Sequence, residues 1–243
     1  MRYLIYSDIH SNLEALRAVL AHAKKEGYDS AICLGDIVGY GADPNECVDI
    51  IASESETSVC LGNHDAAVID ADERGYLNPV AQAGVSYSAA RLTPENVSFL
   101  KSLPLIIEFE NNFIASHSSP YKPENWIYVL EPIEATDAFH VMTHPLAFIG
   151  HTHFPVVHNS NGLVKPILPG DRVRIHGGNK YIINVGSVGQ PRDADPRAAY
   201  VIYDDQKRLA EVVRVAYDVD AATEKILKAG LPPMLADRIR RGY

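Results

Sequence analysis

The chain has 243 residues, of which 47% are hydrophobic and 22% are charged, a balance typical of globular proteins. Its 22 basic and 31 acidic side chains give a net charge of −9, which disfavours binding to bulk nucleic acid or to an anionic membrane. The apolar runs fall far short of the roughly 20 residues that a membrane-spanning helix needs, and the N-terminal run, which meets Asp8, is too short for a signal peptide. We therefore expect a cytoplasmic protein without a membrane partner.

The N-terminal quarter of the chain alternates between strand and helix patterns. Ser11 with Glu14 fits a capping box that begins a helix, and Gly27 ends that helical pattern. Asp43 followed by Pro44 is the start signal of a second helix. Short apolar runs predict buried strands over 2–7, 30–34 and 57–61. This alternation predicts parallel β-α-β pairing.

The rest of the chain adds helices in the middle and strands in the second half. Residues 66–103 read as mostly helical, with a helix start at Thr93-Pro94, and 221–241 form a helical stretch that is interrupted at Pro232-Pro233. Two strands flank Asn111-Asn112, a pair typical of a hairpin turn. The predicted strands are 105–109, 113–116, 147–149, 156–158, 181–185, 199–203 and 211–215. We expect one domain over 1–243, built as a sandwich of two sheets with helices outside.

Several short polar segments stand at the ends of predicted strands or in the adjoining loops. They are Asp8-Ile9-His10, Gly35-Asp36, Gly62-Asn63-His64-Asp65, His117 and Gly150-His151-Thr152-His153. Each is a weak signal alone, since a Gly-Asp pair is usually a turn. Their positions strengthen the signal, because ligands of α/β sheets gather at the carboxyl ends of strands. Carboxylate, amide and imidazole groups suit manganese, iron, zinc or cobalt, and so many candidates suit two ions that share a carboxylate.

In order and spacing, these segments resemble the motifs of the calcineurin-like metallophosphoesterase superfamily. The stretch Asn184-Val185-Gly186-Ser187-Val188 also resembles a segment of its small prokaryotic members. The resemblance covers most of the chain and implies a four-layer α/β/β/α fold with two mixed sheets. It also implies two divalent metal ions, such as Mn²⁺, Fe²⁺ or Fe³⁺, or Zn²⁺. By this resemblance one ion is held by Asp8, His10 and His153, the other by Asn63, His117 and His151, and both by Asp36.

Further roles follow from the resemblance and from position. His64 would stand near the scissile ester, stabilise the developing charge and protonate the leaving oxygen. Asp65 would orient the His64 ring, or else only begin a helix. Asn12, Ser187 and Arg192 are candidate substrate contacts, with Ser187 also placed to touch the metal ligands. The alternatives are a helix entry for Asn12 and a surface ion pair with the next residue for Arg192.

The resemblance implies a phosphoesterase in which a metal-bound hydroxide attacks phosphorus. The stretch from Gly35 to Gly41 lacks the Asp-Arg pair of the phosphoprotein phosphatases, and Asp65 stands where they carry glutamate. A protein phosphatase and the related symmetrical dinucleoside-tetraphosphate hydrolase are therefore disfavoured. We expect a phosphodiesterase that acts on a small phosphate ester or nucleotide. The alternatives are a phosphomonoesterase or nucleotide phosphatase, and a non-catalytic scaffold of the same fold.

The charge of the expected ions fits a small anionic substrate. Two divalent cations add about +4 locally, which attracts a phosphate although the chain is acidic. Bulk nucleic acid is not expected as a partner, and both a monomer and a small homo-oligomer remain open. Trp126 with Tyr121 and Tyr128 could stack a base, but interior packing is the favoured interpretation.

Overall fold

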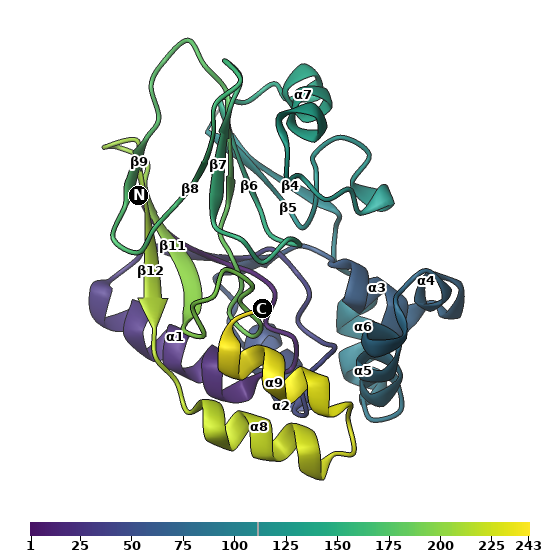
Figure 1. Ribbon diagram of the computed structural model, residues 1–243. Helices are drawn as coiled ribbons and strands as arrows, with labels where there is room; N and C mark the ends of the chain where they lie inside the picture. Colours follow the sequence, from purple (N-terminus) through teal and green to yellow (C-terminus); the bar gives the residue numbers. More distant parts are fainter. Residues whose placement is uncertain (111) are drawn as a thin grey trace.

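Two mixed six-stranded sheets face each other at the centre of the molecule (Figure 1). The structure is a computed structural model that describes residues 1–110 and 112–243. The first sheet has the order β3 (Thr57–Val59), β2 (Ser30–Cys33), β1 (Arg2–Tyr6), β11 (Ala198–Asp204), β12 (Leu209–Val215) and β9 (Arg172–Arg174). The second has the order β4 (Ile106–Phe109), β5 (Phe113–Ser116), β6 (Leu146–Ile149), β10 (Tyr181–Asn184), β7 (Val156–Asn159) and β8 (Val164–Pro166). Strands β1, β2 and β3 are parallel to one another, and so are β5, β6 and β10.

Alternate residues of β1 divide between two separate cores. Tyr3 and Ile5 pack between the two sheets, where the Tyr3 ring meets Phe113 edge-on with ring centroids 5.0 Å apart. Leu4 and Tyr6 belong to the core between the first sheet and its helices. Because successive side chains of a strand point to opposite faces, the first sheet is buried on both sides.

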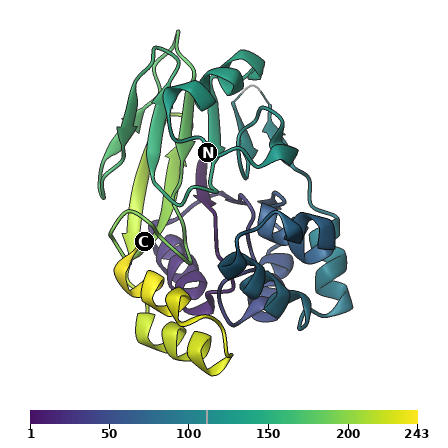
Figure 2. The ribbon, with the colours of Figure 1, turned by 45° about the vertical axis from the view of Figure 1, so that its right-hand side comes forward.

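Helices cover the outer face of each sheet (Figures 1 and 2). Helices α1 (Leu13–Glu26) and α2 (Pro44–Ser53) lie on the first sheet. Helix α7 (Pro132–Val141) packs Ala135 and Ala138 against Ile114 and Ile182 on the outer face of the second sheet. These layers confirm the predicted four-layer α/β/β/α sandwich with mixed sheets.

The remaining helices lie beside this sandwich. The middle segment forms α3 (Asn63–Ile69), α4 (Ala71–Gly75), α5 (Pro79–Ala89) and α6 (Pro94–Lys101). At the chain's end α8 (Val219–Lys228) and α9 (Pro233–Arg241) pack side by side, with the predicted break between them. Among the described residues, no helix is both long enough and apolar enough to cross a membrane.

Several predictions about individual elements need correction. Helix α1 is capped by Asn12 rather than Ser11, because the Asn12 Oδ1 accepts a hydrogen bond from the Ala15 N–H at 3.1 Å. Strands β4 and β5 pair antiparallel as predicted, although Asn111 of their turn lies outside the described residues. Helix α7 was not predicted, despite a capping box formed by Glu131 and Glu134. The three-residue edge strands β8 and β9 were also not predicted, because most of their side chains are solvent-exposed and give no apolar signal.

The interface between the sheets should dominate stability. Phe148 is fully buried there, and its ring lies 5.3 Å from both the Phe113 and the Tyr203 ring centroids. We expect Phe148→Ala to lower the free energy of unfolding by about 3–5 kcal/mol, because it leaves a cavity. Urea unfolding measures this change. The control Leu168→Ala, at a residue that is 62% exposed, should change it by less than about 0.5 kcal/mol; equal losses would contradict a packed interface.

Candidate metal centre

All predicted metal ligands lie together in one buried cluster at the carboxyl ends of five strands. Asp8 and His10 follow β1, Asp36 follows β2, and His117 follows β5. His151 and His153 lie in the loop after β6, and Asn63 is the first residue of α3. Three groups of side chains bring their ligand atoms within 4.8 Å of one another: Asp8, His10 and His153; His10, Asp36 and His64; and Asp36, His117 and His151. Carboxylates and imidazoles at such separations could hold metal ions.

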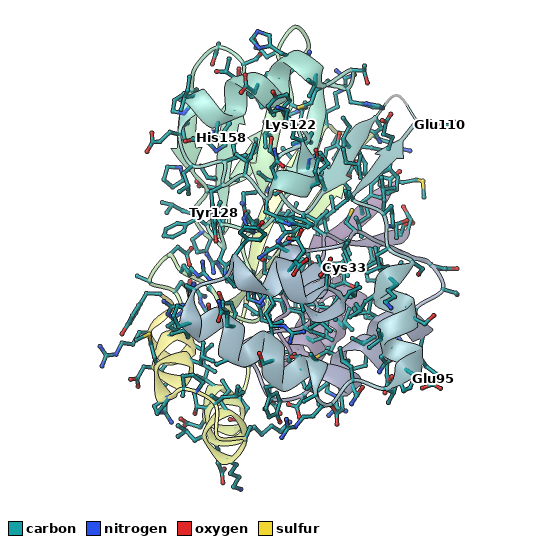
Figure 3. The ribbon with its side chains drawn as sticks, turned by 90° about the vertical axis from the view of Figure 1, so that its right-hand side faces the viewer. Cys33, Glu95, Glu110, Lys122, Tyr128 and His158 are labelled. Atoms are coloured by element: carbon teal, nitrogen blue, oxygen red, sulfur yellow. The ribbon has the colours of Figure 1, made fainter. Side chains whose placement is uncertain are left out.

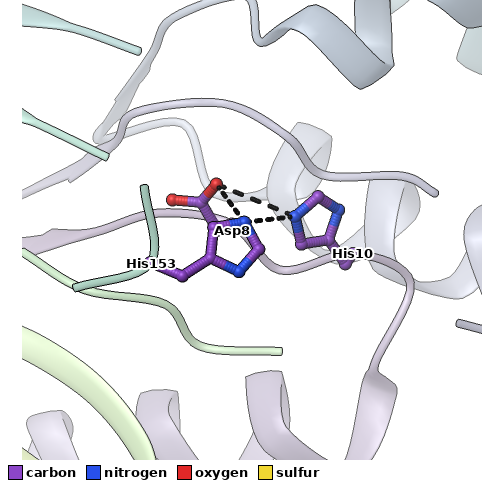
Figure 4. Close-up of side chains that lie close together, drawn as sticks. All are labelled: Asp8, His10 and His153. Atoms are coloured by element: carbon purple, nitrogen blue, oxygen red, sulfur yellow. Dashed lines mark hydrogen bonds and ion pairs between the residues drawn. The ribbon is translucent and has the colours of Figure 1, made fainter. Parts of the chain in front are cut away.

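The first group of ligands turns its lone pairs toward a single point (Figure 4). The His10 Nδ1–H donates to the Val38 carbonyl at 3.2 Å, and the His153 Nδ1–H donates to the Gln190 carbonyl at 2.5 Å. The two Nε2 atoms therefore carry lone pairs, and they face each other at 3.1 Å. The Asp8 Oδ1 lies 3.2 Å from the His153 Nε2 and has no hydrogen-bond partner among the described residues. A cation is the group that this arrangement of acceptors fits.

The second group is oriented in the same way. The His117 Nδ1–H donates to the Leu34 carbonyl at 3.1 Å, which leaves its Nε2 free as a ligand atom. The His151 ring is reversed, because its Nε2–H donates to the Trp126 carbonyl at 2.8 Å and its Nδ1 faces the cluster. The His117 Nε2 lies 3.1 Å from the Asn63 Oδ1 and 3.2 Å from the His151 Nδ1. Backbone carbonyls thus select the ligand nitrogen of each ring.

For His117 and Asp36, burial and the charges of neighbouring side chains act on the pKa in opposite directions. Burial disfavours a charged His117 ring, but the Asp36 and Asp8 carboxylates outweigh it and raise the pKa of His117 to about 9. Burial would raise the pKa of Asp36, but the histidines around it, His117 above all, hold that pKa well below its usual range. Burial and the neighbouring His117 lower the pKa of His151 to about 3. A bound metal ion would therefore displace a proton from His117 and take over its role beside the carboxylates.

Five of the predicted ligands have an unusual backbone conformation. Asp8, His10, Asp36, His151 and His153 all adopt the left-handed conformation, with φ between 50° and 68°. This conformation costs a residue other than glycine about 1–3 kcal/mol, and it persists only where the surrounding structure enforces it. Such strain is concentrated at the ligand positions, which is typical of a functional site.

His64 lies beside the cluster with its ring enclosed. Its backbone N–H donates to the Asp36 Oδ1 at 2.8 Å. The ring lies against the rings of both His10 and Tyr40, with centroids 4.7 Å and 4.5 Å away. Burial outweighs the Asp36 carboxylate and lowers the pKa of His64 to about 4, so the ring is neutral at pH 7. Its Nδ1 is buried and has no hydrogen-bond partner among the described residues.

The contacts of Asp65 agree with the helix-start alternative rather than with orientation of His64. Its carboxylate accepts hydrogen bonds from the Val38 N–H at 3.1 Å and the Gly62 N–H at 3.2 Å. It therefore caps α3 and fixes the loop after β2. Burial and the Asp36 carboxylate raise the pKa of Asp65 to about 7. In the described part of the chain no hydrogen bond joins Asp65 to the His64 ring.

Two of the three candidate substrate contacts are used inside the fold. The Asn12 side chain caps α1 and donates from Nδ2 to the Gly189 carbonyl at 2.9 Å. The Ser187 hydroxyl donates to the Asp8 carbonyl at 2.8 Å and accepts from the Gln190 N–H at 2.8 Å. Both residues are buried and hold the ligand loops in place, so neither is free to contact a substrate.

Arg192, the third candidate, has a half-buried guanidinium beside the first ligand group. Its Nη2 donates to the Gln190 Oε1 at 3.1 Å and to the Tyr40 hydroxyl at 3.4 Å. The alternative of a surface pair with Asp193 is wrong, because Asp193 pairs with Arg214. Within the described chain Arg192 has no acidic partner. Its charge contributes to the lowered pKa of His64.

Sequence reasoning missed Tyr40, Gln190 and the Trp126 carbonyl. Tyr40 lines the His64 ring, Gln190 supplies the carbonyl that orients His153, and Trp126 supplies the one that orients His151. No motif marks a backbone carbonyl. The only sequence feature that could have pointed to Tyr40 is its position next to Gly39 in the loop after β2.

The fold is a two-sheet α/β sandwich with a buried cluster of Asp and His side chains at its strand ends. Residues 1–208 match the model of the calcineurin-like phosphoesterase superfamily domain. The chain therefore belongs to this superfamily, whose members generally bind divalent metals.

Known relatives support this placement. An uncharacterized protein of Methanocaldococcus jannaschii is 43% identical over 242 residues, which cover 98% of this chain and 97% of the relative. The crystal structure of a metallophosphoesterase from Sphaerobacter thermophilus is similar with a TM-score of 0.90 at 36% identity, and the match covers 100% of both chains. A hypothetical protein from Pyrococcus horikoshii OT3 has a TM-score of 0.81 at 18% identity, covering 100% of this chain and 98% of the other. At that identity the likeness shows the fold alone.

Gly39 makes room for the His64 ring. Its φ is +98°, and a Cβ at this position would lie 2.3 Å from the His64 Nδ1. We expect Gly39→Ala to displace the ring and to lower kcat for hydrolysis of bis(p-nitrophenyl) phosphate about tenfold or more, with metal content unchanged. Gly162→Ala is the matched control, because Gly162 has a φ of +92° but nothing within 4 Å of its added Cβ. Equal activity of the two variants would show that His64 needs no such room.

Proposed function

We propose that residues 1–243 form one domain that hydrolyses phosphodiesters with two divalent metal ions, acting on a small phosphate ester or a nucleotide. The observation that carries the proposal is the position of Asp36. Its Oδ2 lies 3.3 Å from the His117 Nε2 and 3.7 Å from the His10 Nε2. One carboxylate oxygen thus stands between two groups of ligands, which is what two ions about 3.5–4 Å apart require.

Each proposed ion has a ligand set of its own besides the shared carboxylate. The first set is Asp8, His10 and His153, and the second is Asn63, His117 and His151. This mixture of oxygen and nitrogen donors suits manganese, iron or zinc. When bound, such a pair of ions generates a nucleophile from water near neutral pH and offsets the charge of the phosphoryl group.

His64 is the proposed partner of the leaving group. Its ring is held by the surrounding protein, because the Asp36 Oδ1 accepts from its backbone N–H and because Gly39 and Tyr40 enclose the ring. The ring is neutral at pH 7, so it holds one proton, which it can share with the leaving oxygen. A hydrogen bond from a fixed ring is stronger in the transition state than one from water, because no reorganisation is needed.

Arg192 is the proposed phosphate contact. Its guanidinium has no acidic partner in the described chain, and its buried Nε has no hydrogen-bond partner there either. A guanidinium beside the centre whose charge is not paired with a carboxylate can bind a phosphoryl oxygen.

The roles of Asp36 and His64 can be separated by counting metal. We expect Asp36→Asn to lose both bound metal and turnover, because the shared ligand is removed. His64→Ala should lose about a hundredfold or more in kcat and should keep its metal. Elemental analysis of each purified variant, beside its kcat, makes this distinction. Equal metal loss in both variants would make His64 a ligand, since it also lies within ligand distance of His10 and Asp36.

Removal and return of metal tests the reaction itself. We expect metal-stripped protein to be inactive, and added Mn²⁺ to restore cleavage of bis(p-nitrophenyl) phosphate with a higher kcat/KM than that for p-nitrophenyl phosphate. Faster cleavage of the monoester would support the phosphomonoesterase alternative instead. If neither compound is cleaved and the protein binds no metal, the non-catalytic scaffold is the better description. Metal binding without cleavage of either would instead point to a selective substrate.

A further inference from the structure

A pocket of about 690 Å³ opens beside the second group of ligands. Its size is within the range of small-molecule sites. Asn63 and His151 form its inner end, so a molecule in the pocket reaches the centre directly. The other lining residues are Glu73, Tyr76, Leu77, Asn78, Glu124, Asn125, Trp126 and Tyr128.

Two separate segments form the walls of this pocket and are tied together. One wall is α4 with the residues that follow it, and the other is the loop that contains the short 3-10 helix η1 (Pro123–Asn125). The Trp126 Nε1–H donates to the Glu73 Oε2 at 3.4 Å, which joins the walls. Lys122 and Trp126 flank η1 with left-handed φ angles of 49° and 51°, so the loop is held in a defined shape.

Aromatic side chains that are not buried in the core line the pocket. Tyr76 is 86% exposed and Tyr128 is 48% exposed. Figure 3 shows Tyr128 midway up the molecule, between the second sheet above and the helices below. Its ring lies against the His151 ring with centroids 4.0 Å apart. Tyr121, by contrast, packs into the core under α7, so only part of the aromatic cluster in this loop is interior.

The polar groups of the pocket are acceptors and amides rather than cations. Glu73 and Glu124 bring carboxylates, and Asn78 and Asn125 bring amides. Among the described residues that line it, none is a lysine or an arginine. Carboxylates accept hydrogen bonds from hydroxyl and amino groups and repel further phosphates. The pocket therefore suits an uncharged, planar group with hydrogen-bond donors.

We propose that this pocket binds the nucleoside part of the substrate, with its base stacked on Tyr76 or Trp126 and its hydroxyl or amino groups on Glu73 or Glu124. Stacking is tolerant of base identity, because every base has a π-face. The substrate class is then a nucleoside phosphodiester with a single phosphate, and nucleoside polyphosphates are excluded by the two carboxylates. This assignment of a substrate rests on the proposed function, whereas the binding preference of the pocket does not.

The pocket carries its own reporter, because Trp126 is the single tryptophan of the chain. We expect adenosine, which has no phosphate to be cleaved, to quench the fluorescence of the full-length protein in a saturable manner. Free tryptophan titrated in parallel corrects for absorbance. In metal-stripped protein, where no cation attracts its phosphates, adenosine triphosphate should bind more weakly than adenosine. Absence of saturable quenching, or tighter binding of the triphosphate, would overturn the proposal.

Variants of Tyr76 test the stacking directly with little effect on folding, because this side chain is largely exposed. Tyr76→Ala should raise the Kd of adenosine about fivefold or more, as expected for the loss of one stacking contact. Tyr76→Phe keeps the ring and should bind like the wild type. Tyr243→Ala, at a half-exposed tyrosine that is not part of the pocket, is the matched control. An unchanged Kd in Tyr76→Ala would rule out stacking on Tyr76, and an equal change in Tyr243→Ala would show that the effect is not local.

A pair of substrates links the pocket to the reaction. The p-nitrophenyl ester of thymidine 5′-monophosphate and methyl p-nitrophenyl phosphate share the scissile bond and the leaving group, but only the first has a nucleoside. We expect a higher kcat/KM for the nucleoside ester, and Tyr76→Ala should reduce that advantage about fivefold or more without affecting the methyl ester. Cleavage of both esters at equal rates would refute the nucleoside pocket and leave the proposed function intact. Quenching by adenosine in a protein that binds no metal and cleaves no ester would refute the proposed function and leave the pocket intact.

Discussion

The candidate metal centre depends on two loops that hydrogen-bond to each other beyond the ends of their strands. Beyond the end of the parallel pair β1 and β2, the Asp8 N–H donates to the Gly35 carbonyl at 3.0 Å and the His10 N–H donates to the Asp36 carbonyl at 2.9 Å. These bonds enforce the left-handed conformations that turn the ligand side chains toward one point. The loop after β3 then joins them through the His64 N–H and the Asp36 carboxylate. Backbone contacts therefore position the candidate ligands.

This arrangement has an electrostatic cost, which explains why the centre suits cations. Asp8 and Asp36 are fully buried carboxylates, and burial of an unpaired charge is strongly destabilising. Each histidine ring among the candidate ligands donates one N–H to a backbone carbonyl and turns its other nitrogen toward the centre. In His117 this second nitrogen is protonated, because the carboxylates raise the pKa of the ring, and its positive charge compensates theirs. Divalent ions would compensate the carboxylates more completely and would stabilise the folded state by their binding free energy.

The sequence predicts a candidate ligand where that residue directly follows a strand. It does not predict a contact with a backbone group or with a residue that is distant in the chain. Asp8, Asp36 and Asn63 could be placed at one edge of a sheet because the β-α-β pattern is local. The two-sheet sandwich followed from the order of the predicted elements, and its four-layer form with mixed sheets followed from the resemblance of the motifs. For Asn12 and Asp65 the sequence offered a helix start beside a functional role and could not decide between them, because a cap and a ligand-like side chain have the same sequence signal until the helix start is known. The short edge strands β8 and β9 escaped prediction for a related reason, since strands of this kind are defined by their pairing and not by their composition.

Trp126 connects the pocket to the centre through two different parts of the same residue. Its carbonyl accepts from the His151 Nε2–H at 2.8 Å, and its indole donates to Glu73 on the opposite wall. A ligand that shifts the indole therefore acts on the loop whose carbonyl fixes the His151 ring, and Tyr128 lies on the other side of this contact against the same ring. If the pocket binds the substrate as proposed, recognition of the substrate and orientation of the His151 ring share one structural element.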